Sequence, residues 1–346
     1  MFEKLEQLNL DQKVVVLPDF FLDRIIKLNS KDEFFRMINS KTTIGGGSIR
    51  GVDTFDIKGG NAVNVAYCLA KLGLTVNLFT VADDFGKSVL NSIFSKFGKS
   101  VELEIKNGKH GSTTSFEFHD NEKLFANVMI SDVGDNKNFG PDLISQSSDL
   151  KIINSAKAIV LTNWGSNLKG TDLAKYLFNN SPKAFHFLDP ADIETRKEEF
   201  REMLKELNQV IDVLSINENE CTSLLKACNF HSGDSIGPSD AESVKNCAKL
   251  LSSEFDLNID LHTRIGSAWS DGKDVIFVES FNVNPKKLTG SGDCWDAADL
   301  AGYFAGLEPW ERLSFSNAYA SLYIGRSEFE PPTIVETIEL IRTKSG

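Results

Sequence analysis

The sequence lacks the features that define several large protein classes. Its five cysteines are scattered, with no Cys-x-x-Cys pair, so a disulfide framework or a zinc site is not indicated and reduced thiols are expected. No stretch approaches the ~18 uninterrupted apolar residues of a membrane span. The charged residues 1–12 also lack the apolar core of a signal peptide. These absences predict a cytoplasmic protein that does not cross a membrane.

A basic surface is missing as well. The chain has 37 Lys and Arg against 49 Asp and Glu, a formal net charge of -12. Such a charge argues against nucleic acid or an anionic membrane as the main partner, although a small anion can still bind in a locally positive pocket. No Gly-x-Gly-x-x-Gly follows the first strand-like run, which argues against a dinucleotide dehydrogenase.

What is present is an alternation of short apolar runs and helical patterns. The 346 residues are 41% hydrophobic and 25% charged, as in ordinary globular proteins. Strands are expected near residues 14–17, 74–81, 158–161, 184–188, 213–216 and 259–261, and helices near 59–73, 87–97, 171–178, 195–207 and 241–255. This alternation predicts an α/β fold with a mainly parallel sheet covered by helices on both sides.

Two stretches interrupt the alternation. Residues 48–58 and 112–130 carry strand-favouring patterns with no helical period, and residues around Asp120-Asn121 read as the turn of a hairpin. These strands are expected to form a small separate sheet, either a lid over a site or a surface hairpin.

Polar residues follow many of the predicted strands. In open α/β sheets, ligands bind beyond the carboxyl ends of the strands. The residues found there are Asp19, Asp23, Asp83, Asp84, Asn163, Asn167, Asp189, Asn217, Glu218, Asn219, Glu220, His262, Thr263 and Arg264. Their joint placement predicts the lining of one cleft. His262 is the exception, because a lone histidine on an apolar strand is more often structural.

The run Thr289-Gly290-Ser291-Gly292-Asp293 opens a late apolar helix. Two glycines permit a tight turn, and a helix N-terminus favours an anion. The other reading is a loop with an aspartate N-cap. Asp296 and Asp299 follow at three-residue spacing, and we expect only Asp293 to be functional and the later two to be solvated.

Two more helix starts carry paired polar residues. Asn61 and Asn64 follow a diglycine turn, where they can face a polar ligand. Asn217 and Glu220 are also three apart, and a carboxylate with an amide there can order waters around Mg²⁺. Each pair can equally be a helix cap.

Taken in order, these motifs resemble those of the PfkB, or ribokinase-like, carbohydrate kinases. Gly59-Gly60-x-x-x-Asn64, Asn217-x-x-Glu220 and Gly290-Ser291-Gly292-Asp293 carry the resemblance, with Asp23 and Asp84-Phe85-Gly86 also matching. It extends from about Val14 to about Ile341. It implies one domain over residues 1–346, a three-layer α/β/α core with lid strands inserted at about 45–58 and 112–131, and a homodimer through the lid.

The resemblance also implies roles for individual residues. Asp293 resembles the general base, and the N–H groups of Gly290, Ser291 and Gly292 resemble the anion hole. Acceptor contacts are implied for Asp23, Gly59, Gly60, Asn64 and Asn163. Nucleotide or phosphate contacts are implied for Asn217, Glu220, Thr263, Thr289 and Asn317, with Glu220 reaching Mg²⁺ through water. The implied reaction transfers the ATP γ-phosphate to a hydroxyl of a sugar or related polyol.

Some positions depart from the family pattern. Lys287 and Leu288 stand where Asp-Thr is usual, and in many members that Asp helps to bind a monovalent cation. Either the lysine replaces the charge of the cation, or the loop lacks cation activation. Ser291 replaces the common Ala. His262-Thr263 looks like the matching strand of the longer ADP-dependent sugar kinases, but ATP remains the expected donor.

Two alternative functions stay open. The family includes nucleoside kinases, and Phe20, Phe21 and Trp164 are candidates for stacking a base or for packing in the core or the lid. The chain is alternatively a catalytically weak regulator that binds a sugar or nucleotide on the same fold.

Overall fold

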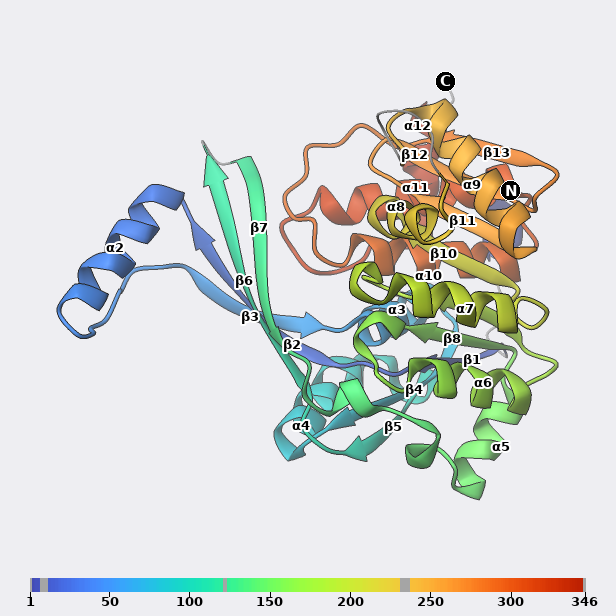
Figure 1. Ribbon diagram of the computed structural model, residues 1–346, viewed down its shortest axis with the longest axis horizontal. Coiled ribbons are helices and arrows are strands. Elements are labelled where there is room, and N and C mark those ends of the chain that lie inside the picture. The colour runs from blue at the N-terminus through green and yellow to red at the C-terminus, as the bar shows by residue number, and fades with distance from the viewer. Residues whose placement is uncertain (1, 7–11, 121–122, 231–236, 345–346) are drawn as a thin grey trace.

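The computed structural model describes residues 2–6, 12–120, 123–230 and 237–344, which form two sheets and the helices around them. The larger sheet has nine strands and the smaller has four. The smaller sheet projects from one side of the main body (Figure 1).

The nine-stranded sheet is mainly parallel. Its order is β13 (Val275–Glu279), β12 (Gly266–Ser270), β11 (Asn258–His262), β10 (Val213–Asn217), β9 (Phe185–Asp189), β8 (Ala158–Thr162), β1 (Lys13–Leu17), β4 (Thr75–Ala82) and β5 (Val101–Asn107). Strands β11 to β5 pair in parallel, while β12 and β13 are antiparallel. The predicted α/β class is therefore confirmed.

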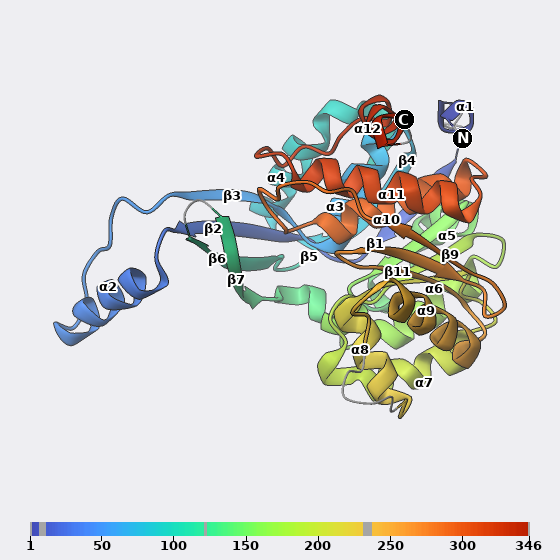
Figure 2. The same ribbon diagram turned by 90° about the horizontal axis from the view of Figure 1, so that it is seen from above.

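Helices cover both faces of this sheet, because alternate residues of each strand point to opposite sides. On β1, Val15 and Leu17 enter one apolar core and Val14 and Val16 the other. The first core includes α5 (Ser147–Ser155), α6 (Gly170–Asn180), α7 (Lys197–Leu207), α8 (Glu218–Ala227) and α9 (Ala241–Phe255). The second includes α1 (Phe2–Glu6), α3 (Asn61–Lys71), α4 (Asp84–Phe94), α10 (Ser291–Phe304), α11 (Pro309–Ile324) and α12 (Ile334–Lys344). Figure 2 shows α10 and α11 on the side of the sheet opposite to α6–α9.

Short 3₁₀ turns complete the connections of the main body. They lie at Ser95–Ser100, Gly134–Asn138, Pro141–Leu143, Trp164–Ser166 and Glu194–Arg196.

The smaller sheet has the order β3 (Thr54–Gly59), β2 (Phe21–Leu28), β6 (Gly111–Asp120) and β7 (Lys123–Asp132). The β6–β7 pair is antiparallel, as the expected hairpin requires, although residues 121–122 of its turn lie outside the described residues. The strand expected at 48–58 begins only at Thr54. Strand β2 was not anticipated, so Asp23 lies within a strand and not in a loop.

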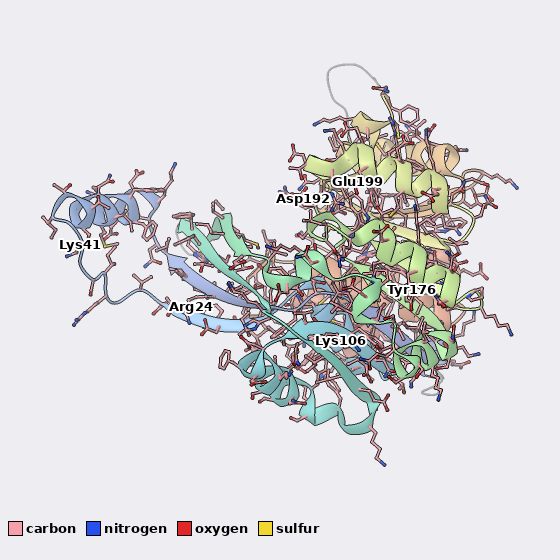
Figure 3. All side chains as sticks on the ribbon, turned by 60° about the horizontal axis from the view of Figure 1, so that its bottom comes forward. Arg24, Lys41, Lys106, Tyr176, Asp192 and Glu199 are labelled. Carbon is pink, nitrogen blue, oxygen red and sulfur yellow. The ribbon has the colours of Figure 1, made fainter. Side chains whose placement is uncertain are left out.

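Helix α2 (Lys31–Thr43) extends the smaller sheet and was also not anticipated. Ser30 caps it by accepting a hydrogen bond from the Glu33 N–H at 3.3 Å. None of its residues is buried, and its side chains, Lys41 among them, project clear of the main body (Figure 3). It contacts the sheet through Phe34, whose ring centroid lies 5.6 Å from that of Phe116.

A buried ion group joins α10, α11 and the central sheet. Arg312 is 1% exposed and donates to Asp260 at 3.0 Å and to Asp299. Asp296 is buried as well, at 1% exposure. The expectation that Asp296 and Asp299 are solvated is therefore wrong, because α10 lies between the sheet and α11 and has no solvated face at these positions. Breaking one partner of such a buried pair costs about 3–5 kcal/mol.

All five cysteines are free thiols, as expected. Within the described ranges, no helix has the length and apolarity needed to cross a membrane.

Candidate active site

The carboxyl ends of the parallel strands and the N-termini of α3 and α10 meet at one edge of the central sheet. Asp19 follows β1 and is the centre of this edge. Its carboxylate accepts hydrogen bonds from the N–H groups of Asn61 and Ala62, both at 2.9 Å, and from Thr162 Oγ1 and Asn163 Nδ2, both at 3.0 Å. One carboxylate therefore fixes the start of α3 against the end of β8.

Asp19 was expected to line the cleft because it follows the first strand, but the family resemblance assigned it no role. Burial raises the pKa of its carboxyl, and the four hydrogen bonds oppose this shift. Asn163, predicted to bind the acceptor, has its amide directed to Asp19 and adopts a left-handed backbone with φ 50.

At the diglycine turn, Gly59 and Gly60 allow the backbone to lie close to Asp23 and Asp19. Gly60 has φ 92, and a Cβ there would lie 2.8 Å from the Asp19 carbonyl oxygen. A Cβ on Gly59 would lie 2.1 Å from a carboxylate oxygen of Asp23 on the adjacent strand β2. Side chains at these positions would push α3 away from both aspartates, so glycine is required by space as well as by conformation.

Asp23 has a carboxylate oxygen, Oδ1, that is buried without a hydrogen-bond partner in the described structure. Burial raises the pKa of this carboxyl to about 6, a hydrogen bond to Thr113 opposes the shift, and the charge of Asp19 adds to it. An unsatisfied acceptor of this kind has a high affinity for a donor such as a hydroxyl group.

A hydrogen-bonded chain of three side chains connects the smaller sheet to α10. Lys58 Nζ on β3 donates to Asn64 Oδ1, and Asn64 Nδ2 on α3 donates to Asp293 Oδ2, both at 2.8 Å. The structure thus brings together Asn64 and Asp293, as the motifs predicted, and adds Lys58, which was missed. Because Lys58 saturates the amide oxygen, the orientation of the Asn64 amide is fixed with its N–H toward the aspartate.

Asp293 is 7% exposed, and its pKa is raised well above the usual value. Burial is the largest cause, the charge of Asp189 adds to it, and the Asn64 hydrogen bond opposes it. A carboxylate with raised proton affinity, held at the start of a helix, is suited to accept a proton from a bound hydroxyl.

Further carboxyl groups surround Asp293. Burial, together with the charge of Asp189, raises the pKa of Glu220 and of Asp296 well above their usual values. Asp296 accepts a hydrogen bond from Ser215, and its carboxyl group also lies within hydrogen-bond reach of the Asp189 carboxyl. The proximity of these buried carboxyls favours protonation of some of them.

Asn217 and Glu220 form a capping box at the start of α8. The Asn217 N–H and Nδ2 donate to the two Glu220 carboxylate oxygens at 2.8 and 2.7 Å, and Asn217 Oδ1 accepts from the N–H groups of residues 219 and 220. The cap reading of this motif is therefore present in the structure. Any role toward phosphate or Mg²⁺ comes in addition and stays a prediction.

The first turn of α10 contains the residues of the predicted anion hole, whose role toward an anion stays a prediction. Gly290, with φ 78, is the N-cap residue. The Ser291 N–H donates to the Leu288 carbonyl at 3.3 Å. The N–H groups of Gly292 and Asp293 lie in the turn that has no intrahelical acceptors. An anion at this turn meets these groups and the positive end of the helix dipole.

The residues predicted to contact the nucleotide make hydrogen bonds to other groups of the protein. Thr263 Oγ1 donates to the Gly266 carbonyl at 2.7 Å, and Thr289 Oγ1 accepts from Asn127 of β7 at 3.3 Å. The Asn317 amide is saturated, because it accepts from Ser267 and Trp295 and donates to the carbonyls of residues 278 and 279. Their nucleotide roles stay predictions.

The aromatic residues considered for base stacking are part of the core. Phe20 and Trp164 are fully buried, and Phe21 is 7% exposed. Rings enclosed in this way present no face to a ligand.

Lys287 is 2% exposed and lies just before the anion-hole residues. Its Nζ donates to the carbonyl oxygens of Arg326 at 2.7 Å and Glu328 at 2.5 Å. It also lies 4.2 Å from the ring centroid of Tyr323. Burial lowers the pKa of Lys287 to about 8. The ammonium group thus joins the start of α10 to the segment that follows α11.

The fold is that of the ribokinase-like kinases. An Arabidopsis thaliana ribokinase complexed with ribose and ATP is 20% identical, with a TM-score of 0.70 and 96% of this chain and 98% of that chain covered. The adenosine kinase of Sinorhizobium meliloti is 16% identical, with a TM-score of 0.70 and coverage of 97% and 99%. An E. coli protein described as ribokinase II, in complex with ATP and Mg²⁺, is 15% identical, with a TM-score of 0.72 and coverage of 96% and 99%.

The pfkB family carbohydrate kinase profile matches residues 43–334. The chain therefore belongs to the pfkB family of carbohydrate kinases, as its motifs indicated. No curated protein sequence matches it. At family level it is a kinase with an alcohol group as acceptor.

The raised pKa of Asp23 predicts a pH-dependent stability difference. A carboxyl whose pKa is about 6 when folded and 3.8 ordinarily favours folding below about pH 4, and that contribution is lost as the pH rises through 6. Asp23→Asn should therefore raise the free energy of unfolding at pH 7 by about 1–3 kcal/mol, and by little at pH 4. Urea unfolding at both pH values measures this.

Asp56→Asn is the matched control on the neighbouring strand. Arg24 holds the pKa of Asp56 below its usual range through a hydrogen bond, and the carboxylate is exposed. This variant should show no gain at pH 7. A gain in Asp23→Asn that is equal at pH 4 and pH 7 would contradict the prediction.

Proposed function

We propose that this protein is a sugar kinase that transfers the γ-phosphate of ATP to a hydroxyl of a sugar or related polyol. The observation that carries the proposal is the placement of Asp293 in the first turn of α10, where Asn64 donates a hydrogen bond to its carboxylate. The proposed base and anion site thus lie on one helix start, and Asn64 joins them to α3, whose preceding Gly59 lies against the carboxylate of Asp23.

The proposed mechanism assigns one step to each group. Asp23 and the start of α3 bind the acceptor, so that one hydroxyl points to Asp293. The Asp293 carboxylate takes the hydroxyl proton as the oxygen bonds to the γ-phosphorus and the bond to the ADP oxygen breaks. The N–H groups of Gly290 and Gly292 stabilise the charge on the transferring phosphoryl group, with Ser291 at the same turn. Phosphoryl transfer depends mainly on such positioning and charge stabilisation.

The donor set fits a hydrated Mg²⁺ ion. The charge of the buried Asp189 raises the pKa of both Glu220 and Asp296, so a cation near these carboxyl groups would relieve the repulsion. Within the described ranges no three such side chains are grouped for direct coordination, so Glu220 would hold the ion through water. When bound, Mg²⁺ neutralises charge on the nucleotide phosphates.

Two alternative functions can be distinguished from a sugar kinase, one by its acceptor and the other by the absence of turnover. A nucleoside kinase is the alternative within the family, and the burial of Phe20 and Trp164 gives no support to base stacking by these rings. A regulator without catalysis would bind ATP but form no product. The proposal also includes one domain over residues 1–346, the smaller sheet as a lid, and a cytosolic location.

Acceptor and mechanism are tested together. Purified protein with Mg²⁺ and either ATP or ADP is assayed against sugars, polyols, sugar acids and nucleosides, and we expect product with ATP and a sugar or polyol. Asp293→Asn should then lower kcat on the order of 10²–10⁴-fold, because general base catalysis is lost, while ATP affinity stays near normal.

Asp172→Asn, an exposed residue in the first turn of α6, is the control and should leave kcat unchanged. Normal turnover in a folded Asp293→Asn variant would exclude Asp293 as the base. Product with nucleosides alone would favour the nucleoside kinase, and ATP binding without product would favour the regulator.

We also propose that the Lys287 ammonium takes the place of a monovalent cation behind the anion hole. Two carbonyl oxygens at hydrogen-bond distance and an aromatic face are the groups that such a cation prefers. The wild-type rate should be the same within about twofold in potassium and in tetramethylammonium chloride. Lys287→Ala should be at least tenfold slower, about 1.4 kcal/mol in activation free energy.

Lys286→Ala changes the exposed neighbouring lysine and should keep the wild-type rate. Potassium or ammonium should restore part of the activity of Lys287→Ala. A wild-type enzyme that requires potassium would show that the lysine does not replace the cation.

The proposal includes a homodimer formed through the smaller sheet. Strand β7 is an edge strand, and Val128, Met129 and Ile130 on it are 50%, 51% and 65% exposed. Edge strands with exposed apolar side chains pair readily with another strand. Sedimentation should show a dimer for the wild type and a monomer for Ile130→Asp. A monomeric wild type at micromolar concentration would exclude this assembly.

A further inference from the structure

His262 lies at the same edge of the sheet as the anion hole. It is the last residue of β11, and its Cα pairs in register with that of Asn217 on β10. Strand β11 therefore delivers an imidazole beside the start of α8 and in front of the start of α10.

The ring is held in place by a second ring. His262 stacks on Trp295 of α10, with centroids 5.0 Å apart and planes 29° apart. Trp295 Nε1 donates to Asn317 Oδ1 at 2.8 Å, and Asn317 in turn donates to the carbonyl of Val278 at 3.0 Å. The orientation of the histidine ring is thus fixed through Trp295 by the saturated Asn317 amide.

The edge of the imidazole faces Gly292. A Cβ on Gly292 would lie 3.4 Å from His262 Cε1 and 4.0 Å from Nε2. Because glycine has no side chain, nothing from Gly292 itself separates the ring from the backbone of this turn. An anion bound by the first-turn N–H groups of α10 would therefore meet the imidazole as well.

The ring nitrogens of His262 make no hydrogen bond in the described part of the chain, and the residue is half-buried. Burial lowers the pKa of His262 to about 4. The imidazole is therefore neutral near pH 7, with one N–H donor and one acceptor nitrogen.

The neighbouring cations are occupied elsewhere. Lys58 donates to Asn64, and Lys287 donates to two carbonyl oxygens. Arg264 is 92% exposed and pairs with Glu218. A neutral N–H donor adds hydrogen bonding at the anion hole without a charge that would lower the proton affinity of Asp293.

We propose that His262 is a catalytic residue that donates a hydrogen bond to the phosphoryl group in transfer at the start of α10. The inference rests on the proposed kinase function and adds a side-chain donor to the backbone donors. It replaces the expectation, drawn from the sequence, that this histidine is structural.

Two substitutions separate donation from packing. His262→Phe keeps a ring that stacks on Trp295 but removes the donor, whereas His262→Gln keeps an N–H donor and loses the ring. Removing one donor to a transition-state anion costs on the order of 10²–10³-fold in kcat. We expect His262→Phe to lose about 10²-fold in kcat with KM values changed less than about threefold, and His262→Gln to stay within about tenfold of the wild type.

His119→Phe is the control, since this histidine lies on β6 of the smaller sheet and should keep the wild-type kcat. A purely structural His262 predicts the opposite order, with His262→Phe close to the wild type and His262→Gln impaired. That order, or equal losses in both variants, would overturn the proposal. Thermal unfolding of each variant verifies that it is folded.

A binding measurement decides the matter without an acceptor. ADP with aluminium fluoride imitates the transferring phosphoryl group, and ADP alone does not. His262→Phe should weaken binding of ADP with aluminium fluoride at least tenfold and binding of ADP by less than twofold. If the wild type phosphorylates no acceptor, the kinase proposal fails, but this comparison still supports or overturns the role of His262.

Discussion

The hydrogen bond between Asn64 and Asp293 is the interaction on which the site depends. It joins residues that are 229 positions apart, and it holds together the N-termini of α3 and α10. The α3 end is itself fixed to β1 and β8 by the Asp19 carboxylate. Through these contacts the first strand of the sheet determines where a carboxylate near the end of the chain is placed.

The buried carboxyl groups of the candidate active site lower the stability of the folded chain, and the same burial gives them the high proton affinity that the proposed chemistry needs. Burial raises the pKa of Asp19, Asp23, Asp189, Asp293 and Asp296, so each is costly to ionise in the folded chain. A buried carboxylate without a full set of hydrogen-bond partners has a high free energy, which is lowered when it binds a proton, a hydroxyl group or a cation. The two apolar cores on either side of the sheet contribute the stability that offsets the cost of burying these carboxyl groups.

Much of the fold could be predicted from the sequence because its strands are short apolar runs followed by polar residues. Strand β2 could not, since its residues Asp23, Arg24 and Lys27 give it no apolar period, and it forms by pairing with β3 and β6. The spacing of Asp293, Asp296 and Asp299 showed that they share a helix face. It could not show that α11 and the sheet cover that face, or that Arg312 neutralises Asp299 there. The motifs likewise located Asn64 and Asp293 but not Lys58, which reaches Asn64 from strand β3. They gave no role to Asp19, whose partners are distant in sequence.

Two departures from the family pattern, Lys287 and His262, have related electrostatic effects at the start of α10. Lys287 brings a fixed positive charge behind the anion hole and directs it to carbonyl oxygens, not to the phosphate site. In the proposed role, His262 adds a donor in front of the same turn, and it is neutral near pH 7 because desolvation lowers the pKa of its imidazole to about 4. A full positive charge facing the transferring group would lower the pKa of Asp293 and weaken it as a base. On the proposed mechanism, a charge behind the turn and an uncharged donor in front of it would stabilise the anion and leave the proton affinity of the carboxylate high.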